Sequence, residues 1–159
     1  MTQFWVGVVS GAHVQRGVAG GFAQVCHGKA HELRRMRPGD GFIYYSPRTE
    51  MMKAGRVLQQ FTAIGYVTSA APYQVQMTPA FRPFRVNVAY IPSTPAHIQR
   101  LKSHLEWTSA TKSWGLVLRR GHFKISEADF LRIAAAMGAR LDEKKLEKEA
   151  RTPELQGSQ

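Results

Sequence analysis

The sequence predicts a single α+β domain built on a small, strongly bent sheet or barrel of five or six short strands. Its 159 residues fit one domain and leave little room for a second. Strand-like segments are mixed with two to four helical ones, and 43% of the residues are hydrophobic, which is enough for a core. We expect this domain to comprise residues 1–139, followed at 140–159 by a charged tail that is helix-prone and then frayed.

Five segments have the composition or the alternation of β-strands, at residues 4–9, 41–46, 61–68, 85–91 and 114–119. The first is a continuous apolar run rich in β-branched and aromatic residues, which is typical of a buried central strand. The second follows a turn that contains Pro38 and Gly39. Gly65, within the third, indicates a bulge or a close approach of two backbones.

Two helices have recognisable starts. The segment Ser93-Thr94-Pro95 is typical of a helix start, and the apolar stripe behind it predicts a helix as far as Leu105. Ser126 is a candidate cap for the other helix, which we expect to end at Gly138. Shorter helical pieces or turns are expected at residues 12–21 and 31–36.

The remaining segments are predicted loops, at residues 22–29, 48–60 and 69–84. The first has neither a helical nor a strand period, so we interpret it as a functional loop or a short extended piece. The third contains three prolines and more large apolar side chains than a plain connection needs, namely Tyr73, Met77, Phe81 and Phe84.

The formal net charge is +11, from 22 lysines and arginines against 11 aspartates and glutamates. Residues 140–159 contain five basic and five acidic residues, so the whole excess belongs to residues 1–139. A folded domain this basic is expected to bind a polyanion. Nucleic acid is the preferred candidate, ahead of an anionic membrane or an acidic protein.

A membrane or secreted protein is not expected. No apolar run approaches the roughly 18 residues of a membrane helix, and the N-terminus lacks the basic region and cleavage site of a secretory signal. Cys26 is the only cysteine and cannot form an internal disulfide, which indicates a reducing compartment. We therefore expect a cytoplasmic protein without membrane attachment.

Motifs for catalysis or metal binding are weak. His27 and His31 have helical spacing, but a zinc site needs three or four ligands and no partner motif accompanies them. Cys26 next to His27 is adjacency in sequence, which does not make a nucleophile–base pair. The six acidic residues of the domain form no evident pair, and no phosphate-binding glycine motif follows a strand. We expect no catalytic residue, metal or cofactor.

Cationic and aromatic residues are the remaining signal. The arginines lie mostly at element ends and in loops, where side chains can reach a phosphate backbone. Aromatic rings interleaved with them are typical of sites that stack an extruded base, although the same rings also suit a hydrophobic core. Within strand 41–46, we expect one of Tyr44 and Tyr45 to face the core and the other a pocket or solvent.

An ordered series of short motifs resembles the EVE domain, and more narrowly the small bacterial proteins that consist of little else. The series covers about residues 3–138 and excludes the tail. Its pieces are FWVGVVS at 4–10, GFAQVCHGK at 21–29, the turn 36–40 with IYYSP at 43–47, and then FxAIG, FxPFR, WG and FxISxxDF in order.

This resemblance implies a PUA-like fold, a bent β-barrel with peripheral helices that is related to the YTH and ASCH domains. YTH domains hold a methylated adenine in an aromatic cage, and EVE domains are proposed to read modified bases in DNA or RNA. The resemblance places Phe22 near a cage position and makes residues 73–84 another wall of the cavity. The ligand-binding candidates it implies are Ser10, His13, Phe22, Gln24, His27, Lys29, Tyr44, Tyr45, Ser46, Phe84 and Trp114, with Arg82, Arg85 and Arg119 for the nucleic-acid backbone.

Together these observations predict a non-catalytic module that reads a modified base of DNA or RNA, with Phe22 and Tyr45 stacking on that base. Two alternatives stay open. One is a hydrolase of small nucleosides that uses Lys29 or Cys26, and the other is an RNA-binding module without base selectivity.

Overall fold

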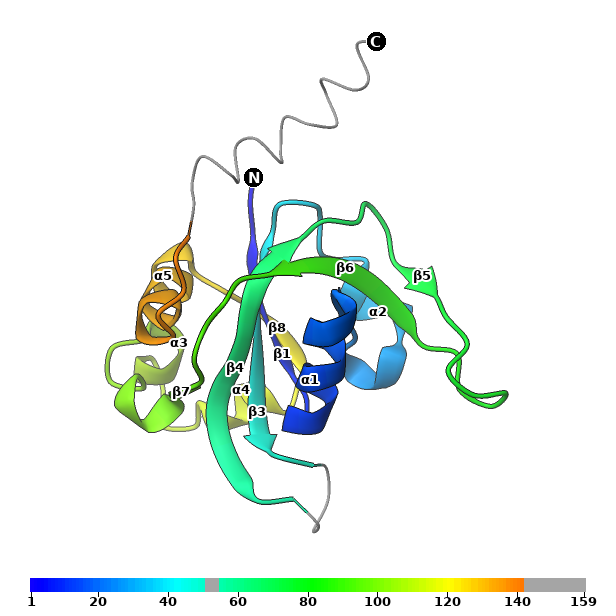
Figure 1. Ribbon diagram of the computed structural model, residues 1–159. Helices are drawn as coiled ribbons and strands as arrows, with labels where there is room; N and C mark the ends of the chain where they lie inside the picture. Colours follow the sequence, from blue (N-terminus) through cyan, green and yellow to red (C-terminus); the bar gives the residue numbers. More distant parts are fainter. Residues whose placement is uncertain (51–54, 142–159) are drawn as a thin grey trace.

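The computed structural model describes residues 1–50 and 55–141 (Figure 1). Within them the chain forms a mixed sheet that curls into a half-barrel and carries short helices on its outside. The α+β class and the strongly bent sheet are therefore confirmed. Most of the charged tail predicted at residues 140–159 lies outside the described residues. The strands are β1 (Phe4–Val8), β2 (Phe22–Ala23), β3 (Gly41–Arg48), β4 (Val57–Val67), β5 (Tyr73–Gln74), β6 (Phe84–Tyr90), β7 (Ala96–His97) and β8 (His122–Ile125).

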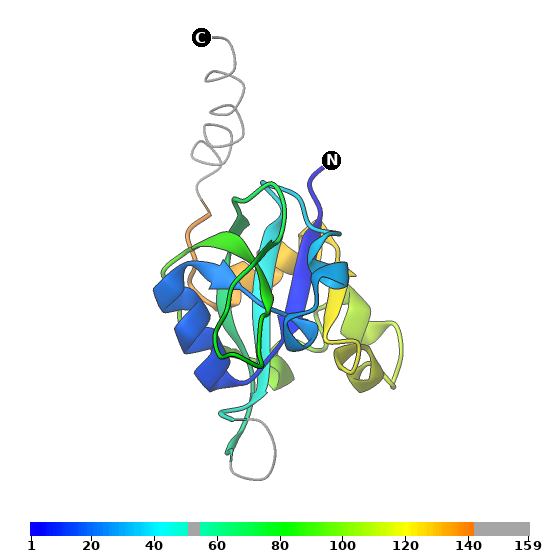
Figure 2. The ribbon, with the colours of Figure 1, turned by 90° about the vertical axis from the view of Figure 1, so that its right-hand side faces the viewer.

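The sheet has a path of six strands among the described residues, in the order β2-β6-β4-β3-β1-β8, while β5 pairs with β6 and β7 with β4. β1 is parallel to β3 and antiparallel to β8. In both views β6 arches over α1 (Figures 1 and 2), and in Figure 1 the chain between β4 and β6 projects from the body. The helical elements are α1 (Gly11–Gly20), η1 (Cys26–Gly28), α2 (Ala30–Leu33), η3 (Ile98–Arg100), α3 (Glu106–Ser109), α4 (Gly115–Leu118) and α5 (Glu127–Ala136).

Both faces of the curled sheet are buried. Because side chains alternate along a strand, Trp5 and Tyr44 enter one core, against α1 and α2, while Ile43 and Tyr45 enter a second core against α5. The expectation that one of Tyr44 and Tyr45 faces a pocket or solvent is therefore wrong: the two side chains are 0% and 2% exposed. The expectation fails because elements cover both faces of β3, so neither of its sides is open.

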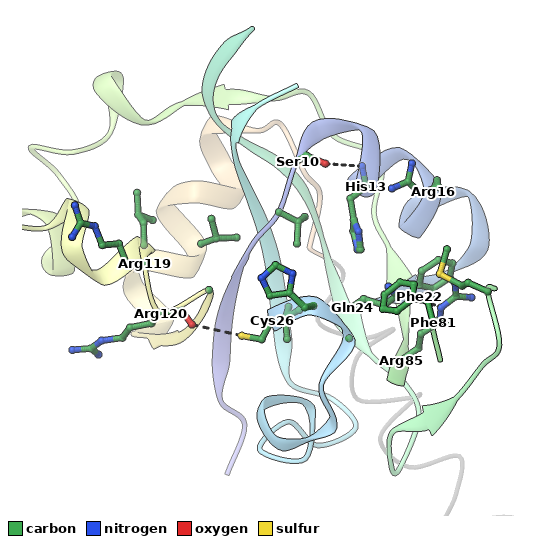
Figure 3. Close-up of a pocket in the computed structure, with 18 residues that line it drawn as sticks. Ser10, His13, Arg16, Phe22, Gln24, Cys26, Phe81, Arg85, Arg119 and Arg120 are labelled. Atoms are coloured by element: carbon green, nitrogen blue, oxygen red, sulfur yellow. Dashed lines mark hydrogen bonds between the residues drawn. The ribbon is translucent and has the colours of Figure 1, made fainter. Parts of the chain in front are cut away.

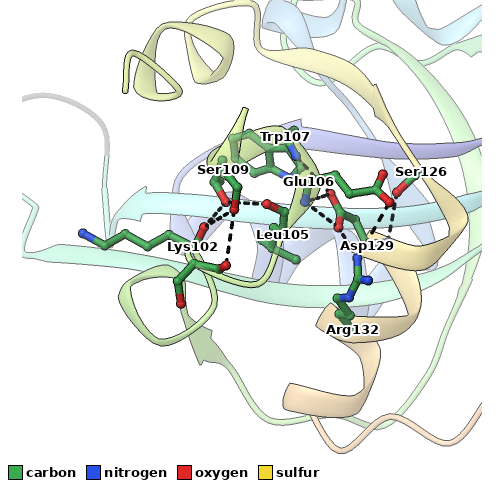
Figure 4. Close-up of polar contacts among 10 residues, drawn as sticks. Lys102, Leu105, Glu106, Trp107, Ser109, Ser126, Asp129 and Arg132 are labelled. Atoms are coloured by element: carbon green, nitrogen blue, oxygen red, sulfur yellow. Dashed lines mark hydrogen bonds and ion pairs between the residues drawn. The ribbon is translucent and has the colours of Figure 1, made fainter. Parts of the chain in front are cut away.

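Two buried carboxylates hold backbone segments together instead of forming a site. Asp40 accepts hydrogen bonds at 3.0 Å from the indole of Trp5 and from two backbone N–H groups. Asp129 accepts from the first two N–H groups of α3, from Glu106 at 2.9 Å and Trp107 at 3.2 Å, while Ser126 caps α5 through the Asp129 N–H (Figure 4). One carboxylate therefore joins the N-termini of two helices.

Four of the predicted strands correspond to β1, β3, β4 and β6. The expected close approach at Gly65 is confirmed, because a Cβ there would collide with the carbonyl of Ala89 on β6. The predicted loop 48–60 is corrected in part: β4 already begins at Val57, while residues 51–54 lie outside the described residues.

Two sequence predictions in the second half of the chain are wrong. Residues 93–105 form the short strand β7 and the turn η3 instead of a continuous helix, because pairing with β4 keeps the chain extended at its start. Residues 114–119 contain the helical turn α4 instead of a strand. The strand of this region is β8, whose four residues pair with β1. Such single-turn elements are too short to show a period.

Candidate functional site

A cavity of about 500 Å³ lies beyond the C-terminal end of β1 (Figure 3). Its walls come from segments that are far apart in the chain: α1, β2 and the residues after it, η1, the loop after β5, β6, and the end of α4 with the turn behind it. We call residues 73–84, which form β5 and the hairpin leading into β6, the arm. The cavity therefore lies between the arm and the segment after α4.

The first wall is the start of α1. The Ser10 hydroxyl accepts a hydrogen bond from the His13 backbone N–H at 3.2 Å and so caps the helix. This cap fixes the first turn, from which the His13 ring projects into the cavity region (Figure 3). The ring packs edge-on against the buried Tyr44, with 6.0 Å between centroids.

His13 is uncharged at neutral pH. Burial and, to a smaller extent, the guanidinium groups of Arg16 and Arg85 lower its pKa to about 4, while a hydrogen bond to the Gln24 backbone acts in the other direction. Its buried Nε2 has no hydrogen-bond partner within the described part of the chain. Buried polar atoms are normally satisfied, so this wall contains an unused hydrogen-bonding group.

The adjoining wall is a stack of Arg85 on Phe22 (Figure 3). The Tyr44 hydroxyl accepts from the Gln24 N–H at 2.8 Å and donates to the Gln24 carbonyl at 3.0 Å, which fixes the chain after β2. The Gln24 side-chain oxygen accepts from Arg85 Nε, and the guanidinium carbon of Arg85 lies 3.7 Å from the centre of the Phe22 ring. Gly20 lies against the same ring, since a Cβ there would collide with it. A ligand on this side meets a flat cation backed by an aromatic ring.

Below these walls, η1 has a strained backbone. Cys26, His27 and Gly28 have φ values of 51°, 60° and 78°, and the first two are uncommon for residues with a side chain. The arm packs tightly on this bend, because a Cβ at Gly28 would collide with Pro83 and lie 3.6 Å from Phe81. Backbone strain of this kind is found at binding and active sites.

The thiol beside this bend is held in its neutral form. Cys26 Sγ lies 3.6 Å from the carbonyl of Arg120, and burial raises the pKa of the thiol, with the charge of Glu32 adding to the effect. Glu32 is itself engaged, because it contacts Arg35 and the buried ring of His122, each at 2.9 Å. A thiol with a raised pKa is a poor nucleophile at neutral pH.

The cavity is strongly cationic. None of its 18 described lining residues is an aspartate or a glutamate. Arg119 and Arg120 lie across the cavity from Phe22, Phe81 and Arg85 (Figure 3). This arrangement suits an anionic ligand with a flat, stackable part. The lining arginines are Arg16, Arg85, Arg119 and Arg120.

The structure brings half of the predicted site residues together in this cavity. These are Ser10, His13, Phe22, Gln24, His27, Arg85 and Arg119. The arm also supplies a wall, through Met77 and Phe81, as the resemblance implies. Tyr44 is buried behind the wall, where it holds Gln24.

The other predicted residues do not line the cavity. Tyr45 packs on Phe61 in the second core, with 5.4 Å between ring centroids, so the sheet separates it from Phe22 and the expected stacking pair is not assembled. Ser46 is hydrogen-bonded to Thr62 at 2.9 Å. Trp114 packs against Trp107 on the second core. Phe84 packs on the first core, while Lys29 and Arg82 are exposed outside the cavity.

Several lining residues are absent from the sequence prediction. Arg16 follows His13 by one helical turn of α1, a segment that was expected as either a short helix or a turn, and only the helical alternative places the two side chains on one face. Arg120 is adjacent to the predicted Arg119. Leu118 was hidden by the incorrect strand at residues 114–119, since its place in the wall depends on α4.

Two features are absent from the described ranges, 1–50 and 55–141. These ranges contain no cluster of three or more His, Cys, Asp or Glu side chains able to hold a metal ion. None of their helices has the length and apolar character needed to span a bilayer.

The half-barrel with a cavity at one end of β1 agrees with the PUA-like fold that the resemblance to EVE domains implies. The EVE domain model matches residues 3–136, and the chain therefore belongs to the EVE-domain family. It is 49% identical over 140 residues to the UPF0310 protein YdcG of Bacillus subtilis. The aligned region covers 88% of this chain and 95% of YdcG. It is 46% identical to a UPF0310 protein of Streptococcus mutans, over 86% of this chain and 98% of the relative.

Solved structures show the same fold at low sequence identity. The crystal structure of Atu2648 from Agrobacterium tumefaciens matches with a TM-score of 0.55 and 12% identity, over 87% of this chain and 94% of that one. The NMR structure of Rpa0253 from Rhodopseudomonas palustris matches with a TM-score of 0.54 and 13% identity, over 86% and 94%.

Proposed function

We propose that this protein is a non-catalytic nucleic-acid-binding module that holds one modified base in the cavity. The observation that carries this proposal is the stack of Arg85 on Phe22 in a cavity lined by four arginines. Bases stack on arginine planes as well as on aromatic rings, and arginine binds phosphate oxygens in a fixed geometry. The cavity volume of about 500 Å³ is within the usual range for small-ligand sites.

The residue roles differ from those that the sequence predicts. Arg85 takes the stacking role that Tyr45 was expected to share, because Arg85 lies over Phe22 and Tyr45 lies in the other core. Arg119 and Arg120 lie on the facing rim with their exposed side chains directed away from the cavity, where they can hold phosphates outside it (Figure 3). Gln24 and His13 supply polar groups for the edge of the base.

Binding without catalysis is supported by the state of the candidate nucleophiles. The pKa of Cys26 is raised by burial, and Lys29 does not line the cavity. A nucleoside hydrolase would also need a general acid or base, and His13, with a pKa of about 4, could serve only as a weak base at neutral pH. Turnover of a nucleoside that is lost in Cys26→Ser would favour the hydrolase instead.

The proposal is tested by titrating short labelled oligonucleotides at two salt concentrations. The probes carry 5-methylcytosine, 5-hydroxymethylcytosine or N6-methyladenine, each compared with its unmodified parent. We expect one modified probe to bind at least about tenfold more tightly than its parent, a difference of about 1.4 kcal/mol. Equal affinities with a steep salt dependence would identify a non-selective module, and no binding to any probe would refute the proposal.

A matched pair of variants separates stacking from charge. Arg85→Lys keeps the positive charge but removes the flat guanidinium over Phe22, whereas Arg82→Lys makes the same change on an arginine that does not line the cavity. We expect Arg85→Lys to reduce or abolish the preference for the modified base and Arg82→Lys to leave it unchanged. Equal behaviour of the two variants would exclude Arg85 as the stacking residue.

A further inference from the structure

Two exposed apolar side chains lie where the arm borders the cavity. Met77 and Phe81 line the cavity and yet keep 46% and 38% of their surface in solvent. Exposed side chains of this size are expected in a binding surface when they gather beside a pocket. Both belong to the projecting part of the chain between β4 and β6 (Figure 1).

The arm holds these side chains in a fixed arrangement. Its base is paired with β6, and the pairing continues with a hydrogen bond from the Val75 N–H to the Pro83 carbonyl at 3.0 Å. At the tip, the Met77 N–H donates to the Phe81 carbonyl at 3.0 Å, and the Phe81 N–H donates to Thr78 at 3.1 Å. The arm is also docked on η1, where Pro83 leaves no room for a side chain at residue 28. Met77 and Phe81 are therefore preorganised, which lowers the entropy cost of binding.

The surroundings of the arm suit a polyanion. Residues 69–84 contain no acidic residue, and Arg82 is exposed next to Phe81. Across the cavity, Arg119 and Arg120 form a cationic edge (Figure 3). The cavity mouth therefore has one apolar edge and one cationic edge, a combination that matches the stacked bases and the phosphates of a nucleic-acid duplex.

We propose that Met77 and Phe81 form a wedge that enters the base stack of a duplex and fills the space left by the base held in the cavity. This inference rests on the proposed function. Extruding a base breaks its stacking on both neighbours, and apolar side chains inserted at such a step replace part of that contact. Because the wedge and the cavity share a wall, the same protein position can fill the gap and receive the base.

The experiment compares duplex and single-stranded probes. The double variant Met77→Ala/Phe81→Ala is titrated with duplex DNA that carries the best-bound modified base, and with the modified strand alone. Because both side chains also line the cavity, we expect some loss for either probe, but a loss for the duplex that is about 5- to 100-fold larger than the loss for the single strand, as for one additional aromatic stacking contact. Phe81→Trp, which keeps a ring, should retain duplex binding.

Two controls match the altered residues in exposure. Tyr73, also 38% exposed, lies on the arm but does not line the cavity, and Leu131, 48% exposed, lies on α5. Tyr73→Ala and Leu131→Ala should leave duplex binding unchanged. Circular dichroism of each variant verifies that it is folded.

Three results would overturn the wedge. An equal loss for duplex and single strand would make Phe81 a cavity wall only, and an unchanged duplex affinity would leave Met77 and Phe81 without a role. An unaltered protein that binds the single strand but no duplex would refute the wedge while the proposed function stands. Failure to bind either probe is a separate result, because it refutes the proposed function as well.

Discussion

The Tyr44 hydroxyl makes two hydrogen bonds to the backbone of Gln24, and its removal in Tyr44→Phe tests how the cavity wall is held. The ring is fully buried, so no water can replace the hydroxyl without rearrangement. The substitution leaves one N–H and one carbonyl without their partner. An unsatisfied buried group costs about 1 to 3 kcal/mol, and we expect Tyr44→Phe to lower the free energy of unfolding by about 2 to 4 kcal/mol.

Two other tyrosines provide a graded comparison. Tyr90 donates a hydrogen bond, at 2.8 Å, to the Phe22 carbonyl, also interacts with the Tyr44 hydroxyl, and is half-buried. Tyr73 bonds to the Asn87 side chain in a position that solvent reaches. We therefore expect the loss of stability to decrease in the order Tyr44→Phe, Tyr90→Phe, Tyr73→Phe, with Tyr73→Phe below about 0.5 kcal/mol.

Urea denaturation followed by far-UV circular dichroism measures the three variants, with tryptophan fluorescence as a second probe. At this chain length a loss of 1 kcal/mol lowers Tm by about 2 to 4 °C, so Tyr44→Phe should melt about 4 to 16 °C below the unaltered protein. Because Gln24 contacts Arg85, the variant should also bind the modified oligonucleotide more weakly under conditions where it is folded. A Tyr44→Phe protein as stable as Tyr73→Phe would refute the assigned role of the hydroxyl.

Three further predictions concern stability and are measured by the same denaturation. His13 has a pKa of about 4 in the folded protein against 6.5 for the free side chain, so the unfolded chain binds more protons between these values. Stability should therefore fall as pH falls from about 6.5 to 4, by up to about 3 kcal/mol. His13→Gln should remove that part of the pH dependence. If the variant and the unaltered protein had the same stability at every pH, the lowered pKa would be contradicted. Gly28→Ala should lower the free energy of unfolding by at least about 1 kcal/mol more than Gly39→Ala, because both residues have positive φ but only the Cβ at residue 28 would collide with Pro83. Equal losses of stability would show that the arm shifts to make room for the Cβ. Asp40→Ala removes the acceptor of three hydrogen bonds and should cost about 3 kcal/mol or more; a loss below 1 kcal/mol would show that water replaces the carboxylate.

The parts of the fold that could be predicted are those with a strong local signal. The apolar runs at residues 4–9 and 41–46 became β1 and β3, and the cap at Ser126 marked the start of α5. The short strands β5, β7 and β8 were missed because pairing with strands far away in the sequence decides them. β8 is a strand because β1 offers an unpaired edge, which its own four residues do not reveal.

Several residues of the site could be predicted from the sequence, but their arrangement in space could not. The motif at residues 21–29 gave Phe22, Gln24 and His27, which do line the cavity. It could not show that Tyr45 belongs to the other core, because a curled sheet with two covered faces buries both members of an alternating pair. Nor could it show that Arg85 covers Phe22, since that contact joins residues 63 positions apart.

Several departures from the rules of stable folding lie at the cavity, although Arg48, Trp107 and His122 also have unsatisfied buried nitrogens elsewhere among the described residues. Two of the three non-glycine residues with positive φ among those described, Cys26 and His27, form its wall, and His13 presents an unsatisfied buried nitrogen beside uncompensated arginines. Elsewhere the buried carboxylates Asp40 and Asp129 are fully engaged with backbone N–H groups. Backbone strain, an unsatisfied polar atom and unpaired positive charge each lower stability. Their presence together in one cavity is expected where the residues serve ligand binding and not stability. A bound anion would neutralise the arginines, so the ligand should raise Tm as well as occupy the cavity.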